Sequence, residues 1–208
     1  NTDGLDTNPS SVFNWTGAES FSIEMWVQTD VDVTLSGTQV LVGRTGTGFQ
    51  WWIGTIDGKA TFFVSAGGDS ATGAGAGADL SDGDPHHVVF VRNGTTGDNT
   101  LYVDDNTPVV DNQAFSTGFD SNSAPLTIGY LNQSPFFHFD GYIDEVAIYN
   151  RMLEPEEITA HRMSGMDYCG GSEAASAFAP YPDNTTAMWH LDEGGGSSYV
   201  DVIGGNDA

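Results

Sequence analysis

The chain has 208 residues, and its 29 acidic side chains against five basic ones give a formal charge of −24. That balance argues against nucleic acid as a partner, because phosphate contacts need clustered Lys and Arg. No run of about 18 apolar residues occurs, which argues against membrane insertion, and the single cysteine, Cys169, leaves no intramolecular disulfide.

The acidic charge also indicates something about the surroundings of the protein. Such a charge keeps a protein soluble but makes it repel itself, and the repulsion weakens where salt shortens the screening length. We therefore expect a saline environment such as seawater or brine. Divalent cations would help in the same way, and Asp outnumbers Glu by 21 to 8, which suits calcium sites built from short carboxylates.

Period-two segments rich in β-branched and aromatic residues recur along the chain, separated by Gly, Asn, Asp and Pro. In the first of them, residues 21–28, one face carries Phe21, Ile23, Met25 and Val27, and one face must belong to the core. This is the pattern of a β-sandwich. Further strands are expected at 39–43, 48–56, 60–66, 87–92, 99–103, 125–130 and 141–149.

Two other segments interrupt the strand pattern. Segment 66–84 consists mainly of Gly, Ala, Ser and Asp, and we expect a loop that is too poor in large apolar residues to bury anything. One helix of about two turns is predicted over 155–162, because proline stands in its first turn and Glu156 and Glu157 lie near its positive end.

The C-terminal part has a composition of its own. Residues 164–185 are small, polar and rich in Gly, Ala and Pro, which is typical of a linker. Residues 186–192 have a strand pattern again, with Trp189 and Leu191 on one face. The expected organisation is therefore a sandwich over 1–163, a linker over 164–185 and a further strand within 186–208.

Three blocks of the sequence resemble, in order, the signature strands of the laminin G-like, concanavalin A-like jelly rolls of bacterial or archaeal extracellular proteins. They are residues 21–27 (FSIEMWV), 86–104, which hold HHVVFVRNG and LYVD, and 139–158, which begin FDGYIDEVAIYNR. The resemblance covers residues 1–163. It implies an all-β antiparallel jelly-roll β-sandwich with one short helix and an extra C-terminal strand, in a protein that is secreted or held at the cell surface.

The two ends of the chain are exchanged relative to that family. Residues 187–196 look like the strand and turn with which such domains begin, whereas residues 3–6 look like a motif that normally follows this strand. Three arrangements fit. The tail folds back onto its own sandwich, it inserts into a neighbouring subunit through Trp189 and Leu191, or it begins a further repeat. Strand addition from a neighbour is an established way to complete a sheet.

The same fold hosts glycoside hydrolases, and the laminarinase-type relatives carry a Glu-x-Asp-x-x-Glu strand. The nearest segment here places Tyr142 where the nucleophile would stand, and its carboxylates, Asp144 and Glu145, are adjacent, so a regular strand would send them to opposite faces. Retaining enzymes need a pair about 5 Å apart. His86 and His87 are likewise adjacent, and we expect one packed and one edge histidine. No catalytic residue and no enzymatic activity are predicted.

Two kinds of binding site remain. The resemblance implies structural Ca²⁺ between the early Asp-Gly turn and the late FxGxIDE block, and the matching residues are Asp3, Asp6, Asp140 and Asp144. Sugar binding needs exposed aromatic rings beside polar groups. The candidates for such a site are Trp52, Tyr130, Phe136 and Phe137.

The expected function is a non-catalytic extracellular binding or adhesion module, stabilised by Ca²⁺, that recognises a glycan or a surface protein. The alternative is a structural subunit of a filament or surface layer that polymerises by exchange of its C-terminal strand. A polysaccharide hydrolase is the third and least favoured possibility.

Overall fold

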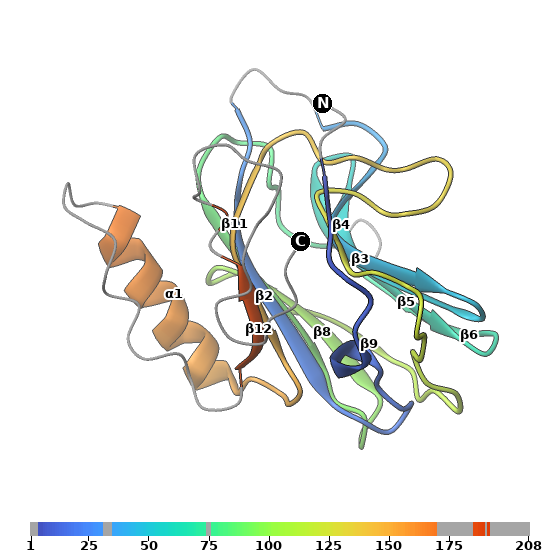
Figure 1. Ribbon diagram of the computed structural model, residues 1–208. Coiled ribbons are helices and arrows are strands. Elements are labelled where there is room, and N and C mark those ends of the chain that lie inside the picture. Colours follow the sequence, from blue (N-terminus) through green and yellow to red (C-terminus); the bar gives the residue numbers. More distant parts are fainter. Residues whose placement is uncertain (1–3, 31–34, 74–75, 170–184, 190, 192–208) are drawn as a thin grey trace.

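The computed structural model describes residues 4–30, 35–73, 76–169, 185–189 and 191. It is a sandwich of two antiparallel sheets with six strands each, which confirms the predicted jelly-roll β-sandwich. In the order of pairing, the first sheet is β1-β10-β3-β4-β5-β6 and the second is β12-β11-β2-β7-β8-β9, and the two face each other in Figure 1. The strands are β1 (Leu5–Asp6), β2 (Phe21–Gln28), β3 (Thr38–Gly46), β4 (Phe49–Ile56), β5 (Lys59–Ala66), β6 (Asp69–Thr72), β7 (His86–Arg92), β8 (Asp98–Val103), β9 (Val109–Asn112), β10 (Thr127–Ile128), β11 (Tyr142–Tyr149) and β12 (Thr185–Trp189), with a 3-10 helix η1 (Ser11–Phe13) and one α-helix, α1 (Pro155–Cys169).

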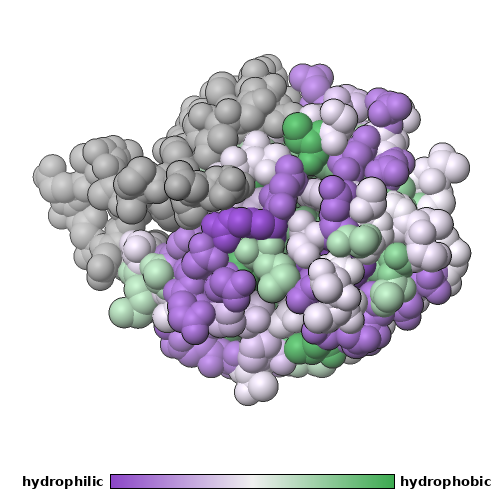
Figure 2. All heavy atoms as spheres, turned by 90° about the horizontal axis from the view of Figure 1, so that it is seen from below, coloured by the Kyte–Doolittle hydropathy of each residue, from purple (hydrophilic) through white to green (hydrophobic). Residues whose placement is uncertain are grey.

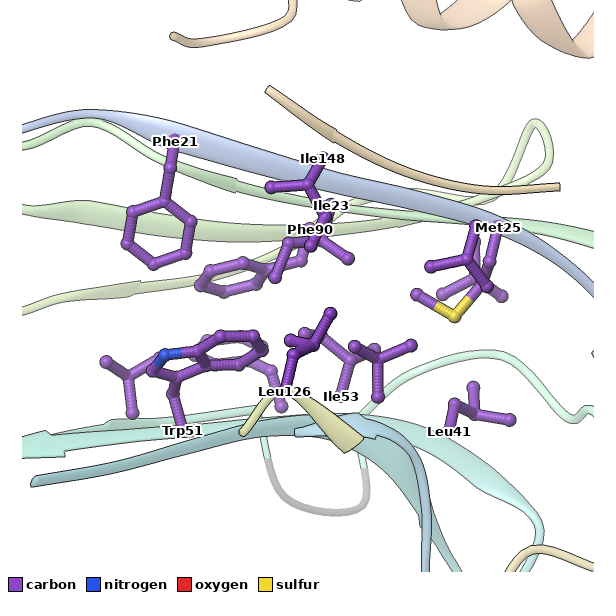
Figure 3. Packing of buried hydrophobic residues seen from close by; sticks show 14 of the residues in the cluster. Phe21, Ile23, Met25, Leu41, Trp51, Ile53, Phe90, Leu126 and Ile148 are labelled. Carbon is purple, nitrogen blue, oxygen red and sulfur yellow. The ribbon is translucent and has the colours of Figure 1, made fainter. Parts of the chain in front are cut away.

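The core fills the space between the sheets. On β2, the predicted inner residues Phe21, Ile23 and Met25 are fully buried, and they point towards Trp51 and Ile53 of β4 (Figure 3). The alternation that was visible in the sequence therefore marks the inner face of this strand. Full burial of each large apolar side chain contributes roughly 1.5–3 kcal/mol to stability.

Ser22 and Glu24 on the other face of β2 are buried as well, and α1 covers the outer face of the second sheet (Figure 1). Leu153 and Ile158 pack there against Tyr149 of β11. The helix continues to Cys169, so the predicted end at residue 162 was too early. A close contact explains the difference: a Cβ atom on Gly165 would come within 2.4 Å of the Trp26 ring, so the glycine lets the backbone of the helix lie directly on the indole.

Segment 66–84 was expected to bury nothing, and this was wrong. Residues Asp69–Thr72 form β6, which pairs with β5, and the side chains of Ala71 and Leu80 are fully inaccessible to solvent. The small residues permit close packing, since a Cβ atom on Gly77 would lie 2.1 Å from the carbonyl oxygen of Ala60. Composition alone does not reveal this kind of backbone contact.

The C-terminal strand β12 lies at the edge of the second sheet and pairs antiparallel with β11 of the same chain. Ala187 and Trp189 are fully buried in the main core, and Leu191 packs against it. This pairing is the one that the fold-back arrangement requires, and the choice between fold-back, exchange and a further repeat stays a prediction. Residues 170–184 of the expected linker and 192–208 of the tail lie outside the described residues.

Two buried arginines fasten the long connection between β9 and β10. Arg44 donates hydrogen bonds to the backbone carbonyls of Phe119 (3.1 Å), Ser121 (2.8 Å) and Ala124 (3.2 Å) in this connection, and to two groups of residues 13–14. Arg92 donates to the carbonyl of Gln113 and stacks over the rings at positions 115 and 119. Burial lowers the pKa of each guanidinium from 12.5 to about 10, so both remain charged at neutral pH.

The surface gives two further observations. Seen from below, the described part of the molecule is mostly hydrophilic, and its hydrophobic residues are scattered rather than gathered into a broad patch (Figure 2). Among the described residues, no helix is long and apolar enough to cross a membrane.

Candidate functional site

The outer face of the first sheet carries a loop of residues 129–139, which we call the aromatic loop. It leaves the sheet after β10 and returns beside β3, where the amide of Val40 donates to the carbonyl of Phe137 (2.8 Å). The amide of Phe139 closes the loop by donating to the carbonyl of Gly129 (2.9 Å). Backbone hydrogen bonds thus fix both ends of the loop to the sheet.

The underside of the loop is apolar. Trp51 and Trp52 point to opposite faces of β4, as expected from their adjacency, so Trp51 joins the main core and Trp52 faces outwards. The outward ring is covered by Leu131 of the loop and is only 9% exposed. Phe63 stacks beside it at 6.0 Å, and Phe137 packs against the same cluster. Trp52 and Phe137 therefore support the loop from below.

The upper side of the loop presents three rings, Tyr130, Phe136 and His138, which we call the aromatic patch. Tyr130 and His138 stack with their centroids 5.3 Å apart and their planes inclined by 12°. Phe136 lies 6.4 Å from the first and 6.2 Å from the second, and its side chain is 50% exposed. The structure thus brings together two of the four aromatic residues predicted for ligand binding.

His138 was not predicted as a member of this site. The backbone between Phe136 and His138 is not extended, because Phe137 has a φ of 48°, so strand alternation does not identify His138 from the sequence.

Polar groups border the patch. The hydroxyl of Tyr130 donates a hydrogen bond to the carboxylate of Asp6 on β1. Partial burial and the nearby carboxylate raise the pKa of Tyr130 above its ordinary value, so the hydroxyl keeps its proton and remains a donor. Within the loop, the amide of Gln133 accepts from Gln50 of β4. An aromatic surface therefore lies beside a hydrogen-bonded tyrosine–aspartate pair.

The structure describes three of the four residues predicted to bind calcium, Asp6, Asp140 and Asp144. No group of three or more His, Cys, Asp or Glu side chains is placed to share a metal ion in the described part of the chain, and Asp3 lies outside it. Asp6 receives the hydroxyl of Tyr130, and the backbone amide of Asp140 is bound by Gln39. Asp144 caps the amide of Glu145. A role for calcium stays a prediction.

The strand that resembles the catalytic strand of glycoside hydrolases is irregular. A β-bulge separates Asp144 from Ala147, and Glu145 within it has a φ of 52°. The regular alternation assumed from the sequence is therefore interrupted at these carboxylates. Tyr142, at the position of the nucleophile, is exposed.

A buried polar cluster lies beneath α1. The carboxylate of Glu24 is 6% exposed and contacts His87 at 2.6 Å, His161 at 3.0 Å and the hydroxyl of Tyr149 at 2.9 Å. Burial alone would raise the pKa of Glu24, but the hydrogen bonds from His161 and His87 lower it to about 2. Through these contacts the acid links His161 of the helix to His87 and Tyr149 of the sheet.

The neighbouring His86 was expected to be an edge or a packed residue, but it too lies between two acids. Its ring nitrogens contact Asp104 at 2.7 Å and Asp82 at 2.9 Å. The hydrogen bond to Asp104 is the largest cause that raises the pKa of His86 from 6.5 to about 9.

A raised histidine pKa makes the stability of the protein depend on pH. The stabilisation from His86 is fully present below about pH 6.5 and is lost as the pH rises through about 9. We expect the free energy of unfolding to fall by on the order of 2 kcal/mol between these values, relative to His86→Gln. Urea denaturation of both proteins across this range measures the difference. Parallel curves for the two proteins would contradict this assignment.

A groove of about 530 Å³ lies at the junction of η1, the start of β2 and the β11–α1 connection. The ring of Trp15 lines it but is 3% exposed and stacks on Phe21 at 3.9 Å, while its N–H group donates to Asn150. No exposed aromatic ring is offered here, so the aromatic patch is the better candidate for binding a ligand.

Comparison with known proteins agrees with the fold. A laminin G-type family model, described as the concanavalin A-like lectin/glucanases superfamily, matches residues 1–159. No curated protein sequence matches the chain significantly. A candidate carbohydrate-binding protein from Bacteroides ovatus has a similar structure, with a TM-score of 0.70 and 17% identity over 100% of this chain and 56% of its own.

Two other solved structures are similar over a part of the chain. Domain 4 of an extracellular arabinanase from Geobacillus stearothermophilus, solved with arabinotriose, has a TM-score of 0.54 and 19% identity over 76% of this chain and 70% of its own. The binding domain of botulinum neurotoxin DC, solved with SialylT, has a TM-score of 0.52 and 18% identity over 69% of this chain and 35% of its own. The chain thus spans about half of the Bacteroides protein and about a third of the toxin domain.

Proposed function

We propose a carbohydrate-binding role for this chain, which belongs to the concanavalin A-like lectin/glucanases superfamily. In this proposal it is a non-catalytic, secreted or surface-held module, and the aromatic patch is its binding surface. The observation that carries the proposal is the half-exposed ring of Phe136, held beside Tyr130 and His138 on a buried apolar support.

The chemistry of a sugar suits such a surface. One face of a sugar ring consists of C–H groups, and packing them on an aromatic ring removes apolar surface from water. The hydroxyl groups at the rim of the sugar need hydrogen-bond partners when water leaves. The carboxylate of Asp6 lies beside Tyr130, and Gln133 belongs to the same loop as the three rings. Several of the similar structures are carbohydrate-binding or receptor-binding domains, which supports the same class of function.

The proposal predicts the effect of removing one ring. Phe136→Ala is expected to weaken binding of an oligosaccharide about 10-fold, equivalent to about 1.4 kcal/mol, because the stacking surface is lost while the buried support remains. A glycan array selects the oligosaccharide, and isothermal titration calorimetry measures its dissociation constant.

Val110→Ala is the matched control, since Val110 of β9 is also exposed (56%) but lies on the second sheet. This variant should bind like the unmodified protein. The proposal fails if the array detects no glycan or if the two variants weaken binding equally. If the array detects no glycan but the unmodified protein binds another protein through the patch, the ligand is a surface protein, which is the alternative class of ligand.

A further inference from the structure

We infer that the ligand of the aromatic patch is a neutral saccharide and not an acidic one such as a sialylated, uronate-containing or sulfated glycan. The inference rests on the proposed function and adds the charge class of the ligand. Its basis is that the protein itself engages each of its five Lys and Arg side chains, all of which the structure describes.

Two of the five cations are inside the protein. Arg44 and Arg92 are fully buried and donate to backbone carbonyls and to the side chains of Asn14 and Asn99. A ligand on the surface cannot reach them. Their charges are satisfied by the dipoles of the chain and not by carboxylates in direct contact.

Two of the remaining three lie on the far side of the molecule from the patch. Arg151 follows β11 and forms two hydrogen bonds with Glu157, at 2.8 and 2.9 Å. Arg162 belongs to α1 and contacts both carboxylate oxygens of Asp105. The helix covers the outer face of the second sheet, whereas the aromatic patch lies on the first.

Lys59 of β5 is the one basic residue at the surface of the sheet that carries the patch, because Arg44 of β3, in the same sheet, is fully buried. The Lys59 ammonium group lies 2.8 Å from the carboxylate of Asp79, where the surrounding backbone also forms a β-bridge. Both side chains of this pair are about half exposed, so the pair contributes only a modest energy. Asp79 is nevertheless a carboxylate already in contact with the ammonium group of Lys59, and a ligand on the patch would have to compete with it.

Acidic and neutral sugars therefore meet different conditions at the patch. Recognition of a sugar carboxylate or sulfate relies on an Arg or Lys that donates charge-assisted hydrogen bonds. Here the described neighbour is the carboxylate of Asp6, and the whole chain carries a charge of −24, so an anionic ligand is repelled. The hydroxyls of a neutral sugar, in contrast, can donate to carboxylate and carbonyl acceptors.

The test compares matched ligands by isothermal titration calorimetry at about pH 8, where imidazoles of ordinary pKa are neutral. The neutral probes are lactose, arabinotriose, cellohexaose and methyl-esterified trigalacturonate. The acidic probes are sialyllactose, free trigalacturonate and a heparin hexasaccharide. A trimethylated chitosan hexasaccharide, whose quaternary ammonium groups stay charged at this pH, reports on simple attraction of a cation. Each affinity is measured at two salt concentrations, about 0.05 M and about 1 M NaCl. The higher concentration shortens the screening length to about 3 Å and so suppresses attraction between charges.

We expect one or more neutral probes to bind. A neutral probe should bind at least 10-fold more tightly than its matched acidic probe, as lactose against sialyllactose, and its affinity should change less than twofold between the two salt concentrations. Lys59→Met should leave this binding unchanged, and Phe136→Ala should weaken it. Equal or tighter binding of an acidic probe, or binding of the trimethylated chitosan alone that salt abolishes, would overturn the inference while leaving a glycan-binding function intact. If no probe binds and the array is silent as well, the proposed function itself fails.

Discussion

Replacement of Arg44 by methionine is expected to lower the free energy of unfolding by about 3 kcal/mol. The guanidinium donates to five oxygen atoms, four of them backbone carbonyls of residues 13, 119, 121 and 124. Methionine fills a similar volume but donates nothing, and each buried acceptor left without a donor costs roughly 1–3 kcal/mol, partly offset because a buried charge disappears. Urea denaturation followed by tryptophan fluorescence measures the change.

Arg162→Met is the matched control for this experiment. The same substitution removes an ion pair whose acidic partner, Asp105, is 76% exposed, and such surface pairs contribute about 0–1 kcal/mol. We also expect Arg44→Lys to be destabilised, because one ammonium group cannot reach all five acceptors. Equal stability of Arg44→Met and Arg162→Met would show that the buried guanidinium does not hold the β9–β10 connection.

Replacement of Trp189 by alanine is expected to cost about 3–5 kcal/mol, the range for removal of a fully buried aromatic side chain from a core. The residue lies on β12, pairs with Val146 of β11 and packs 6.5 Å from the ring of Phe13. Thermal unfolding monitored by circular dichroism measures the loss. Met163→Ala, which truncates a 58% exposed side chain of α1, should change stability by less than about 0.5 kcal/mol.

The same experiment tests whether β12 completes its own sandwich or that of a neighbour. If the strand folds back, the unfolding midpoint is independent of protein concentration and the mass in solution is that of one chain. If it is exchanged between chains, the midpoint rises with concentration, because association then contributes to stability. A concentration-dependent midpoint together with open-ended assemblies would favour the structural-subunit alternative.

The sequence was sufficient to predict most of the two sheets, because their strands combine period-two burial with turn residues at both ends. Phe21, Ile23 and Met25 illustrate this. It was not sufficient for β6 or for the last part of α1. Glycines permit close tertiary contacts in both regions, Gly77 with Ala60 in the segment that follows β6 and Gly165 with Trp26 in α1, and glycine-rich composition by itself is typical of loops and linkers.

The candidate site could be predicted in part. Aromatic content indicated Tyr130 and Phe136, and adjacency required one of the two tryptophans at 51–52 to face outwards. The path of residues 129–139 over the sheet decides which rings face a ligand and which rings support the loop from below. No local pattern defines that path, since Leu131 covers Trp52 through a contact between segments far apart in the chain.

The fixed ends of the aromatic loop have a consequence for how a ligand would bind. Ordering a flexible loop on binding costs conformational entropy, roughly 0.5–1.5 kcal/mol for each side chain that is immobilised. Here the amides of Val40 and Phe139 already hold the backbone, and Leu131 is packed beneath it. Tyr130 and His138 are stacked before any ligand arrives. The aromatic patch is therefore preorganised. A small saccharide that touches only two or three rings would lose little of its contact energy to the ordering of the loop.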